Sequence, residues 1–557
     1  MKTKARYALM EFLVRQGVRY IFGNPGTTEL PFLDALQDYP QIVYLLSLQE
    51  NNAVAMADGY ARAARRPALV NLHVTGGLAN GLAMLYDAFR GGTPLVVTAG
   101  QSDTRIQLRE PLLYSDMVSL CRPFTKWSAE VRRGADLILA LRRAFRIAAT
   151  PPRGPVFLSL PMDVLDETEE AEPLPPSPIY PRLSPDPQAV AEAVEILAEA
   201  RHPLILVGDG VAQSQAVGKA VLLAETLGAE VRSLSFSEVN FPMNHPLYRG
   251  TFDPDGPKAQ EILSRYDVLL VVGGPLFQPF VYRPLKPKEG TAVLHLDINP
   301  WELEKNYPIQ VGIWGDIRIG LEALDRSLKE RLTEEQRKEA LEKIERLRSE
   351  KVNQQRAYEE KIRSAGDDPP MDPARLFLEL REVLPPKTVI AGEAITSTGP
   401  MFRMMNFSEP EGYFSLRGGA LGWGIGGALG IKLAFPDRPV VAVIGEGSAL
   451  YGIQGLWTAA TYRIPVTYII CNNRSYRILK YYMKHYYLPG QGLEDRQSVY
   501  PGMDFKDHPL DCASLAKGFG LRAFQVEDPK ELKTVLKEAL SSDQPTLVDV
   551  ALQGGTF

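Results

Sequence analysis

Two short motifs in the last third of the chain carry side chains suited to metal and phosphate binding. The sequence GEGS follows the apolar run 440–444 and supplies the carboxylate of Glu446, whereas NN follows the apolar run 466–471 and supplies the amide of Asn473. Carboxylate and amide oxygens are donors that Mg²⁺ prefers and shares with substrate phosphates. Glycines beside them let backbone N–H groups approach a phosphate. A glycine-rich turn alone would be ordinary, but the two motifs together predict a site for Mg²⁺ and a phosphate-bearing ligand.

These motifs need a scaffold that brings them together. Both apolar runs have the length and β-branched content of buried strands, and the segment from Leu450 to Tyr462 between them has the pattern of a helix. A strand, a crossover helix and a second strand form a parallel unit, which binds ligands at the carboxyl ends of its strands. Because Glu446 and Asn473 both stand at such ends, we expect them to lie close together.

A second set of polar residues follows four predicted strands in the first part of the chain. The strands 20–22, 42–48, 68–72 and 94–99 are followed by Thr27, Glu50, His73 and Gln101. Taken alone, Glu50 is a first-turn glutamate favoured by the helix dipole, and His73 is a satisfied, partly buried histidine. Four polar strand ends together instead indicate one shared cleft.

The composition is that of a globular protein that binds neither nucleic acid nor membrane. Of the 557 residues, 45% are hydrophobic and 23% are charged, and the net charge of −5 argues against a nucleic-acid surface. No apolar run reaches the ~20 residues that a membrane helix needs. Residues 1–18 predict an amphipathic helix rather than a signal peptide. Three scattered cysteines indicate a reducing compartment, so we expect a cytoplasmic protein.

Alternating strand and helix patterns divide the chain into three parts. We expect an α/β fold with three doubly wound parallel-sheet domains. The predicted domains span residues 1–166, 187–332 and 372–557. The proline-rich acidic stretch 163–187 is a predicted linker. Residues 333–362 predict a long solvated helix with Thr333 and Gln336 as its capping box.

The GEGS and NN motifs resemble the cofactor motif of thiamine diphosphate enzymes, which reads GDG and later NN. The resemblance implies that Glu446, Asn473 and the backbone carbonyl of Ser475 bind Mg²⁺. Gly447 and Ser448 would donate backbone N–H groups to the phosphates. Tyr476 is a further candidate cofactor-binding residue, which the resemblance places near the substrate pocket. Glu446 departs from the family, which has Asp at this position. Because Glu is one methylene longer, its carboxylate must fold back or the loop must shift to reach the metal.

The first part of the chain resembles the pyrimidine-binding domain of the benzoylformate decarboxylase family. The matching sequences are FGNPGTTELPFLDAL, LQENNAVAMADGYARA, NLHVTGG and TAGQ. The resemblance implies that Glu50 hydrogen-bonds atom N1′ of the cofactor's aminopyrimidine and so promotes the imino tautomer that deprotonates thiazolium C2. It also implies that Thr27 and His73 are the active-site hydroxyl and imidazole.

Two further stretches resemble the aminopyrimidine site of the same enzymes. In GEAITSTGP, the resemblance places Ile395 and Thr396 against the aminopyrimidine. In LRGGALGWG, it implies that the carbonyl of Gly419 accepts the 4′-amino group and that Leu421 holds the cofactor bent, which is catalysis by positioning. The segment HLDINP resembles the Rossmann-like central domain of the superfamily, for which we predict no nucleotide.

The substrate pocket is expected to be apolar and to suit an aromatic or branched side chain. Its candidate residues are Leu112, Phe280, Leu479 and Tyr482. Phe280 stands where benzoylformate decarboxylase has a second active-site histidine, and a phenyl ring transfers no protons. Three interpretations stay open: His73 alone suffices, His485 substitutes, or the enzyme favours carbon–carbon ligation over aldehyde release.

The resemblance covers nearly the whole chain, in the order pyrimidine-binding, central and diphosphate-binding domain. It implies an enzyme that uses thiamine diphosphate and Mg²⁺ for the nonoxidative decarboxylation of a 2-oxo acid, with carboligation of the enamine as a second outcome. The alternatives are an acetohydroxyacid synthase-like carboligase and a noncatalytic member in which Glu446 impairs metal binding. In this family one cofactor is held by domains of different subunits, which implies a homodimer or homotetramer with active sites at subunit interfaces.

Overall fold

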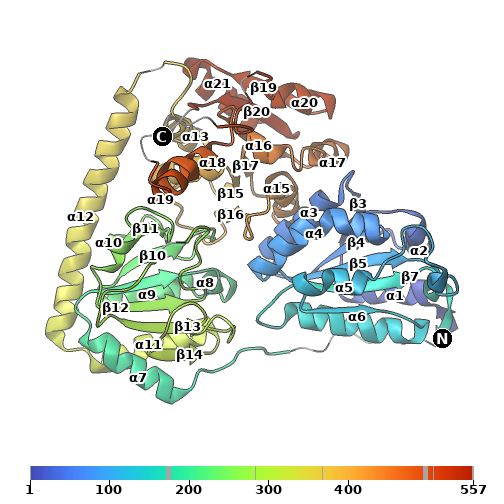
Figure 1. Cartoon of the computed structure of the whole chain (residues 1–557), viewed down its shortest axis with the longest axis horizontal. Helices are drawn as coiled ribbons and strands as arrows, with labels where there is room; N and C mark the ends of the chain where they lie inside the picture. The colour runs from blue at the N-terminus through green and yellow to red at the C-terminus, as the bar shows by residue number, and fades with distance from the viewer. Residues whose placement is uncertain are drawn as a thin grey trace.

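Three six-stranded sheets, flanked by helices, make up the computed structural model (Figure 1). The residues that it describes are 2–170, 177, 179–282, 284–366, 368–493, 500–505 and 507–554. Every strand pair in the three sheets is parallel. The predicted α/β class with three doubly wound parallel sheets is confirmed. Because parallel strands all end at one edge of a sheet, residues that follow the strands are brought together there.

The first sheet has the strand order β3-β2-β4-β5-β7-β6. Its strands are β2 (Tyr20–Asn24), β3 (Val43–Leu46), β4 (Ala68–Leu72), β5 (Leu95–Gln101), β6 (Trp127–Glu130) and β7 (Val156–Pro161). Its helices are α1 (Ala5–Arg15), α2 (Leu30–Leu36), α3 (Glu50–Ala64), α4 (Val74–Gly91), α5 (Met117–Cys121) and α6 (Gly134–Ala149). From β2 the chain adds β3 on one side and β4 on the other, so the order of the strands reverses between β2 and β4. Open parallel sheets bind ligands at such a point. Glu50 begins α3 and His73 precedes α4 at this point.

The second sheet has the strand order β11-β10-β9-β12-β13-β14. Its strands are β9 (Pro203–Val207), β10 (Glu230–Leu234), β11 (Tyr248–Phe252), β12 (Val268–Val272), β13 (Ala292–Asp297) and β14 (Val311–Trp314). Its helices are α7 (Pro187–Glu199), α8 (Gly210–Gln213), α9 (Val217–Leu227), α10 (Ala259–Leu263) and α11 (Ile317–Arg331). The loops after β9 and β12 touch through glycines, since a Cβ atom on Gly210 would lie 2.7 Å from the Cα of Gly273.

The third sheet has the strand order β16-β15-β17-β18-β20-β19. Its strands are β15 (Val389–Glu393), β16 (Tyr413–Ser415), β17 (Val440–Gly445), β18 (Val466–Asn472), β19 (Arg522–Val526) and β20 (Thr546–Ala551). Its longer helices are α13 (Pro373–Val383), α14 (Thr398–Met405), α15 (Trp423–Ala434), α20 (Cys512–Gly518) and α21 (Pro529–Leu540). Strands β17 and β18 are direct neighbours, as the two apolar runs predict.

The connection between β17 and β18 differs from the single helix predicted for 450–462. It contains two short helices, α16 (Glu446–Ala449) and α17 (Gly455–Thr461). A Cβ atom on Gly452 would lie 2.8 Å from the carbonyl oxygen of Gly422, and one on Gly455 would lie 2.8 Å from Cγ2 of Ile425. The backbone approaches a neighbouring segment closely at these glycines, and the helix is interrupted there.

The connections between the sheets follow the sequence in part. Helix α12 (Glu334–Ser364) is the predicted long helix, and the capping box of Thr333 and Gln336 is confirmed. It runs along one side of the molecule in Figure 1. In the predicted linker, β8 (Thr168–Glu170) pairs antiparallel with β1 (Lys2–Lys4), while residues 171–176 and 178 lie outside the described residues.

Helices α3 and α15 join the first sheet to the third. A Cβ atom on Gly59 would collide with the carbonyl of Gly427, and one on Gly430 with the carbonyl of Met56. The two helices therefore pack backbone against backbone, which larger residues would prevent. One hydrophobic cluster contains buried side chains from both sheets, so they share a core.

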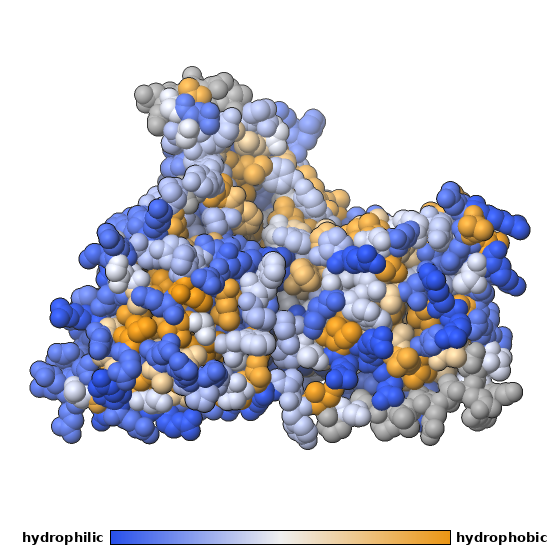
Figure 2. All heavy atoms as spheres, turned by 60° about the horizontal axis from the view of Figure 1, so that its bottom comes forward, coloured by the Kyte–Doolittle hydropathy of each residue, from blue (hydrophilic) through white to orange (hydrophobic). Residues whose placement is uncertain are grey.

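The face of the molecule drawn in Figure 2 is mostly hydrophilic. Figure 2 shows one face on which charged and polar side chains dominate and apolar side chains form scattered groups. Among the described residues, no helix combines the length and the apolar character needed to cross a membrane.

Candidate functional site

The predicted metal ligands meet at the carboxyl ends of β17 and β18. Oε1 of Glu446 accepts a hydrogen bond from the backbone N–H of Ser475 at 3.0 Å. The hydroxyl of Ser475 donates to Oδ1 of Asn473 at 2.8 Å. Glu446 is 1% exposed, and its burial raises its pKa to about 7. A buried carboxylate with only neutral hydrogen-bond partners is stabilised in its charged form by a bound cation.

These ligands fit Mg²⁺ together with a diphosphate. The cluster offers one carboxylate, from Glu446, and the neutral oxygens of Asn473 and Ser475. The described residues contain no group of three or more His, Cys, Asp or Glu side chains suited to a metal. Mg²⁺ in such a site takes further oxygens from substrate phosphates. A Cβ atom on Gly447 would lie 2.6 Å from the ring of Tyr476, so glycine is needed where this ring covers the turn. Ser448 is buried in the same turn.

Glu50 begins α3 at the carboxyl end of the first sheet. Its Oε1 accepts a hydrogen bond from Nδ2 of Asn24 at 3.0 Å, and its Oε2 accepts one from Nδ2 of Asn80 at 3.1 Å. The two amides fix both oxygens of a residue that is 6% exposed. A Cβ atom on Gly77 would lie 3.0 Å from Oε1 of Glu50 and 3.2 Å from Cβ of His73. Glu50 and His73 therefore both lie next to Gly77.

His73 is held by Glu29, a residue that sequence reasoning missed. Nδ1 of His73 lies 2.8 Å from Oε2 of Glu29 and 3.2 Å from the hydroxyl of Thr28. Glu29 is 1% exposed and also accepts the N–H groups of Gly26 at 2.8 Å and Gly100 at 2.7 Å. With Nδ1 engaged by a carboxylate, Nε2 is the nitrogen that can exchange a proton with a ligand.

Thr27 and Gln101, the other two members of the predicted cleft, differ in exposure and in hydrogen bonding. Thr27 is exposed and begins the short 3₁₀ turn Thr27–Glu29 after β2, whereas Thr28 makes the contact with His73. Gln101, the last member of the predicted cleft, is engaged by the loop after β5. Its Nε2 donates to the carbonyl of Ser115 at 3.1 Å and its Oε1 accepts from the N–H of Ser102 at 2.9 Å, so it holds the loop after β5.

A third set of predicted residues lies at the carboxyl end of β15 and in the 416–422 loop. Ile395 and Thr396 follow β15, and Gly419 and Leu421 lie in the loop. Gly419 and Gly422 have φ angles of +86° and +106°, a region that favours glycine. Sequence reasoning missed Glu393, whose carboxylate accepts the N–H groups of Gly422 at 2.6 Å and Gly424 at 2.5 Å. Burial raises the pKa of Glu393 to about 8.

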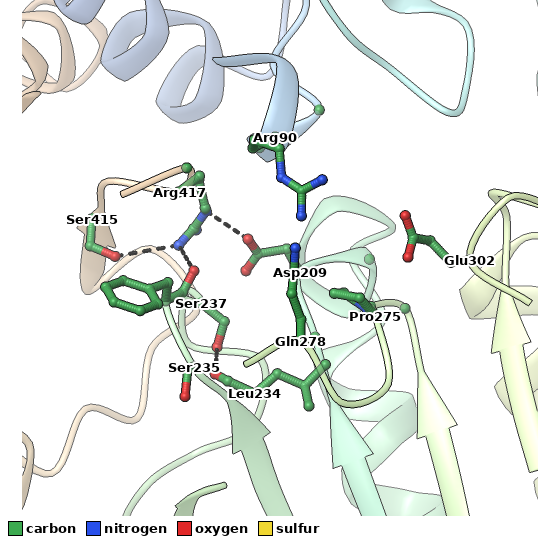
Figure 3. A pocket seen from close by; sticks show the side chains of 18 of the residues that line it. Arg90, Asp209, Leu234, Ser235, Ser237, Pro275, Gln278, Glu302, Ser415 and Arg417 are labelled. Carbon is green, nitrogen blue, oxygen red and sulfur yellow. Dashed lines mark hydrogen bonds and ion pairs between the residues drawn. The ribbon is translucent and has the colours of Figure 1, made fainter. Parts of the chain in front are cut away.

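A cavity of about 1210 Å³ opens between the carboxyl end of the second sheet and the other two sheets (Figure 3). Phe280, Ile395 and Tyr482 line it. The Phe280 ring lies 3.4 Å from the position of a Cβ atom on Gly419 and packs edge to face on Phe236, with centroids 5.6 Å apart. The N–H of Phe280 donates to Asp255 at 2.8 Å.

Other predicted pocket residues do not line this cavity. Leu112 is 90% exposed and Leu479 is 46% exposed. The ring of His485 packs on Tyr481 at a centroid distance of 4.7 Å. Among the described residues of one chain, no hydrogen bond joins Glu50 or His73 to the Glu446 cluster. Glu50 and His73 lie at the carboxyl end of the first sheet, and the Glu446 cluster lies at that of the third.

Three protein-family models match the chain in the order of its three sheets. The model "Thiamine pyrophosphate enzyme, N-terminal TPP binding domain" matches residues 3–119, the central-domain model matches 190–324 and the C-terminal TPP binding domain model matches 395–550. The chain belongs to the thiamine pyrophosphate enzyme family and is a thiamine diphosphate-dependent enzyme. The domain bounds given from the sequence stay a prediction.

Similar proteins include two kinds of enzyme. A benzoylformate decarboxylase of Pseudomonas aeruginosa is 34% identical over 99% of both chains. A probable acetolactate synthase large subunit of Methanocaldococcus jannaschii is 30% identical over 99% of this chain and 92% of that protein. The solved structure of a thiamine diphosphate-dependent 4-hydroxybenzoylformate decarboxylase of Rhodococcus jostii RHA1 superposes with a TM-score of 0.86 at 29% identity and covers 99% of this chain and 100% of its own.

Proposed function

We propose that the protein catalyses the nonoxidative decarboxylation of a 2-oxo acid with thiamine diphosphate and Mg²⁺. The observation that carries the proposal is the position of Glu50 and of the Glu29–His73 pair, which lie together around Gly77. A carboxylate and an imidazole held in fixed orientations are groups that exchange protons with a cofactor and a substrate. Identity of 34% to a benzoylformate decarboxylase over nearly the full chain supports this reaction class.

Glu50, His73, Glu29 and Thr27 have distinct roles in the proposal. Thiamine diphosphate, when bound, supplies the electron sink that accepts the electron pair left by departing CO₂. Glu50 hydrogen-bonds the aminopyrimidine and is kept in place by its two amide partners. His73 moves a proton at Nε2, since Glu29 occupies its Nδ1. Thr27 offers its exposed hydroxyl to the substrate.

Residues of the third sheet would hold the cofactor. The metal ligands are Glu446, Asn473 and Ser475, and the diphosphate is held by Gly447, Ser448 and Tyr476. The aminopyrimidine is held by Ile395, Thr396, Gly419 and Leu421. Phe280 and Tyr482, which line the cavity, would contact the substrate side chain.

Each active site would lie between two subunits of a homodimer or homotetramer. The exposure of Leu112 and Leu479, which a second subunit would cover to complete the pocket, supports this arrangement. Exposed apolar side chains of this size are common at protein interfaces.

A product assay tests the proposal. Purified protein receives thiamine diphosphate, Mg²⁺ and either phenylglyoxylate, pyruvate or a branched 2-oxo acid, and CO₂, free aldehyde and 2-hydroxyketone are quantified. We expect CO₂ and free aldehyde above the cofactor-free blank, and at least a hundredfold loss in Glu50→Gln, on the order of the effect of a lost acid–base group. Absence of turnover with all three substrates, and a Glu50→Gln variant identical to the parent, would refute the proposal.

Carboligation is the second candidate function, because Phe280 provides no proton donor beside Gly419. A 2-hydroxyketone or acetolactate as the main product of the same assay would assign the protein to the carboligases. If the purified protein binds neither Mg²⁺ nor thiamine diphosphate, it would instead be a noncatalytic protein. Glu446 would then be the residue to examine.

A further inference from the structure

The 416–422 loop is held by a carboxylate of the first domain. Asp87, near the end of α4, accepts the backbone N–H of Arg417 at 2.9 Å and that of Gly418 at 2.5 Å. Asp87 is 1% exposed, and burial raises its pKa to about 6, against the effect of these two donors. Two consecutive amide groups on one carboxylate fix the direction of the backbone where it enters Gly419.

The side chain of Arg417 extends from this loop into the second domain. Its Nε lies 2.6 Å from Oδ2 of Asp209, and one terminal nitrogen lies 2.9 Å from Oε1 of Glu238. The other terminal nitrogen donates to the carbonyl of Phe236 at 2.7 Å. The side chain is 4% exposed, and Figure 3 shows it pointing toward Asp209 at the carboxyl end of the second sheet. A guanidinium is suited to such a junction because it binds several acceptors in fixed directions.

The same ion pairs continue into the helices that join the first and third domains. Glu238 also lies 2.7 Å from a terminal nitrogen of Arg62 on α3, and Arg62 lies 3.0 Å from Asp58. Asp58 in turn accepts the indole N–H of Trp423, the first residue of α15, at 2.7 Å. All three domains thus contribute charges to one buried network.

The far end of the loop is held separately. The carboxylate of Glu393 binds the N–H groups of Gly422 and Gly424, where α15 begins. Between this point and Gly418 lie only Gly419, Ala420 and Leu421. The segment expected to hold the aminopyrimidine is therefore suspended between two anchors, and Arg417 is part of one of them.

We propose that Arg417 is a positioning residue, through which the second domain sets the place of Gly419 and Leu421 without itself touching the cofactor. The inference rests on the proposed function in assigning those two residues to the aminopyrimidine. Without the guanidinium, Asp209 and Glu238 keep their charges but lose their link to the loop, and Asp87 alone holds its entry. The loop then samples positions in which the carbonyl of Gly419 no longer meets its ligand.

Hydrogen exchange of the cofactor-free protein tests the inference without cofactor or substrate. The variants are Arg417→Met, Arg417→Lys, Asp209→Asn and, as a control, Arg90→Met, an exposed arginine that lines the same cavity. We expect Arg417→Met and Asp209→Asn to speed amide exchange in residues 416–424 while β17 and β18 stay protected. Arg417→Lys should exchange at an intermediate rate, and Arg90→Met at the parental rate.

Cofactor affinity supplies the second readout. The dissociation constant of thiamine diphosphate with Mg²⁺, followed by tryptophan fluorescence, should rise about tenfold or more in Arg417→Met and less in Arg417→Lys. Parental loop exchange and parental affinity in Arg417→Met would overturn the inference, as would faster exchange spread evenly over all three sheets in Asp209→Asn. A loop that responds as expected in a protein that turns over no 2-oxo acid would refute the proposed function alone.

Discussion

Glu29 and His73 show how one contact can orient an imidazole. The carboxylate occupies Nδ1 of the imidazole and is itself fixed by two backbone N–H groups. Sequence reasoning found His73 because it follows a strand, but missed Glu29, since nothing local to the sequence shows that it pairs with a residue on another strand end. Glu393 was missed for the same reason, because its partners lie in a distant loop.

Replacing Glu29 tests this pairing. We expect Glu29→Gln to lower kcat by about tenfold to a hundredfold, because the imidazole loses the carboxylate that orients it. His73→Gln should lower kcat at least as much. The double variant should be no worse than His73→Gln, as for residues that act as a unit. Multiplicative losses in the double variant, measured by steady-state kinetics, would contradict the pairing.

Glu446 is the position at which the chain departs from its family's motif. Its carboxylate accepts the backbone N–H of Ser475, so the turn accommodates the longer side chain with a hydrogen bond. We expect Glu446→Asp to lose this hydrogen bond and to weaken Mg²⁺-dependent cofactor binding by about tenfold. Glu446→Gln, which keeps the length but not the charge, should weaken it further. A Mg²⁺ titration of cofactor binding measures both variants, and tighter binding by the Asp variant would contradict this view.

At the scale of elements, loops and helix starts carry the site while strands fix their spacing. The sequence predicts β17 and β18 correctly because long apolar β-branched runs have few other structures. It predicts one helix between them, whereas two short ones form, because the close approach of Gly452 and Gly455 to α15 and its preceding loop is a tertiary contact.

The pH dependence of stability should report Glu393. Burial raises its pKa from 4.5 to about 8, and the nearby charge of Asp87 adds to the rise. A raised pKa in the folded state stabilises the protein below pH 4.5 and loses this contribution as the pH rises toward 8. The unfolding free energy of the cofactor-free protein, relative to Glu393→Gln, should therefore fall between pH 5 and 8, by at most about 1.4 kcal/mol per pH unit. A constant or rising difference in denaturant titrations would contradict this assignment.

Alanine should have opposite effects on stability at two helical glycines, one at the contact between α3 and α15 and one in open space on α9. Gly430→Ala should destabilise the protein by about 3 kcal/mol, because its Cβ would collide with the carbonyl of Met56. Gly218→Ala in α9 meets nothing within 4 Å and should stabilise it by roughly 0.5–1 kcal/mol. Thermal unfolding of both variants measures the difference, and equal stability would show that the helices can separate without cost.

At the scale of the whole molecule, the sequence predicts three parallel sheets but not their mutual placement. Local patterns set the elements, whereas the domains are joined by buried ion pairs such as Arg417–Asp209 that no local pattern reveals. The resemblance to thiamine diphosphate enzymes indicated Glu50, His73 and Glu446 as site residues. It did not indicate the ion pairs of Arg417 that link the third domain to the second.

Coexpression of two inactive variants tests whether active sites are shared between subunits. Glu50→Gln and Glu446→Gln should each abolish activity alone. Mixed dimers of the two carry one intact site, so coexpression should restore activity to about a quarter of the parental value. Cosedimentation of differently tagged chains confirms that mixed dimers form, and absence of activity in them would place each site within one chain.

The glycine contacts of α3 and α15 also bear on how the gene can be divided. A fragment that ends after the first sheet would expose the apolar flank of α3, and a fragment that begins with the third would expose α15, since both contribute to one hydrophobic cluster. Neither piece has a complete interior of its own. The two outer thirds of the chain should therefore be obtained together, either as one polypeptide or by coexpression. The second sheet has one hydrophobic cluster of its own and shares another with the third sheet, so a fragment without it would also expose apolar surface.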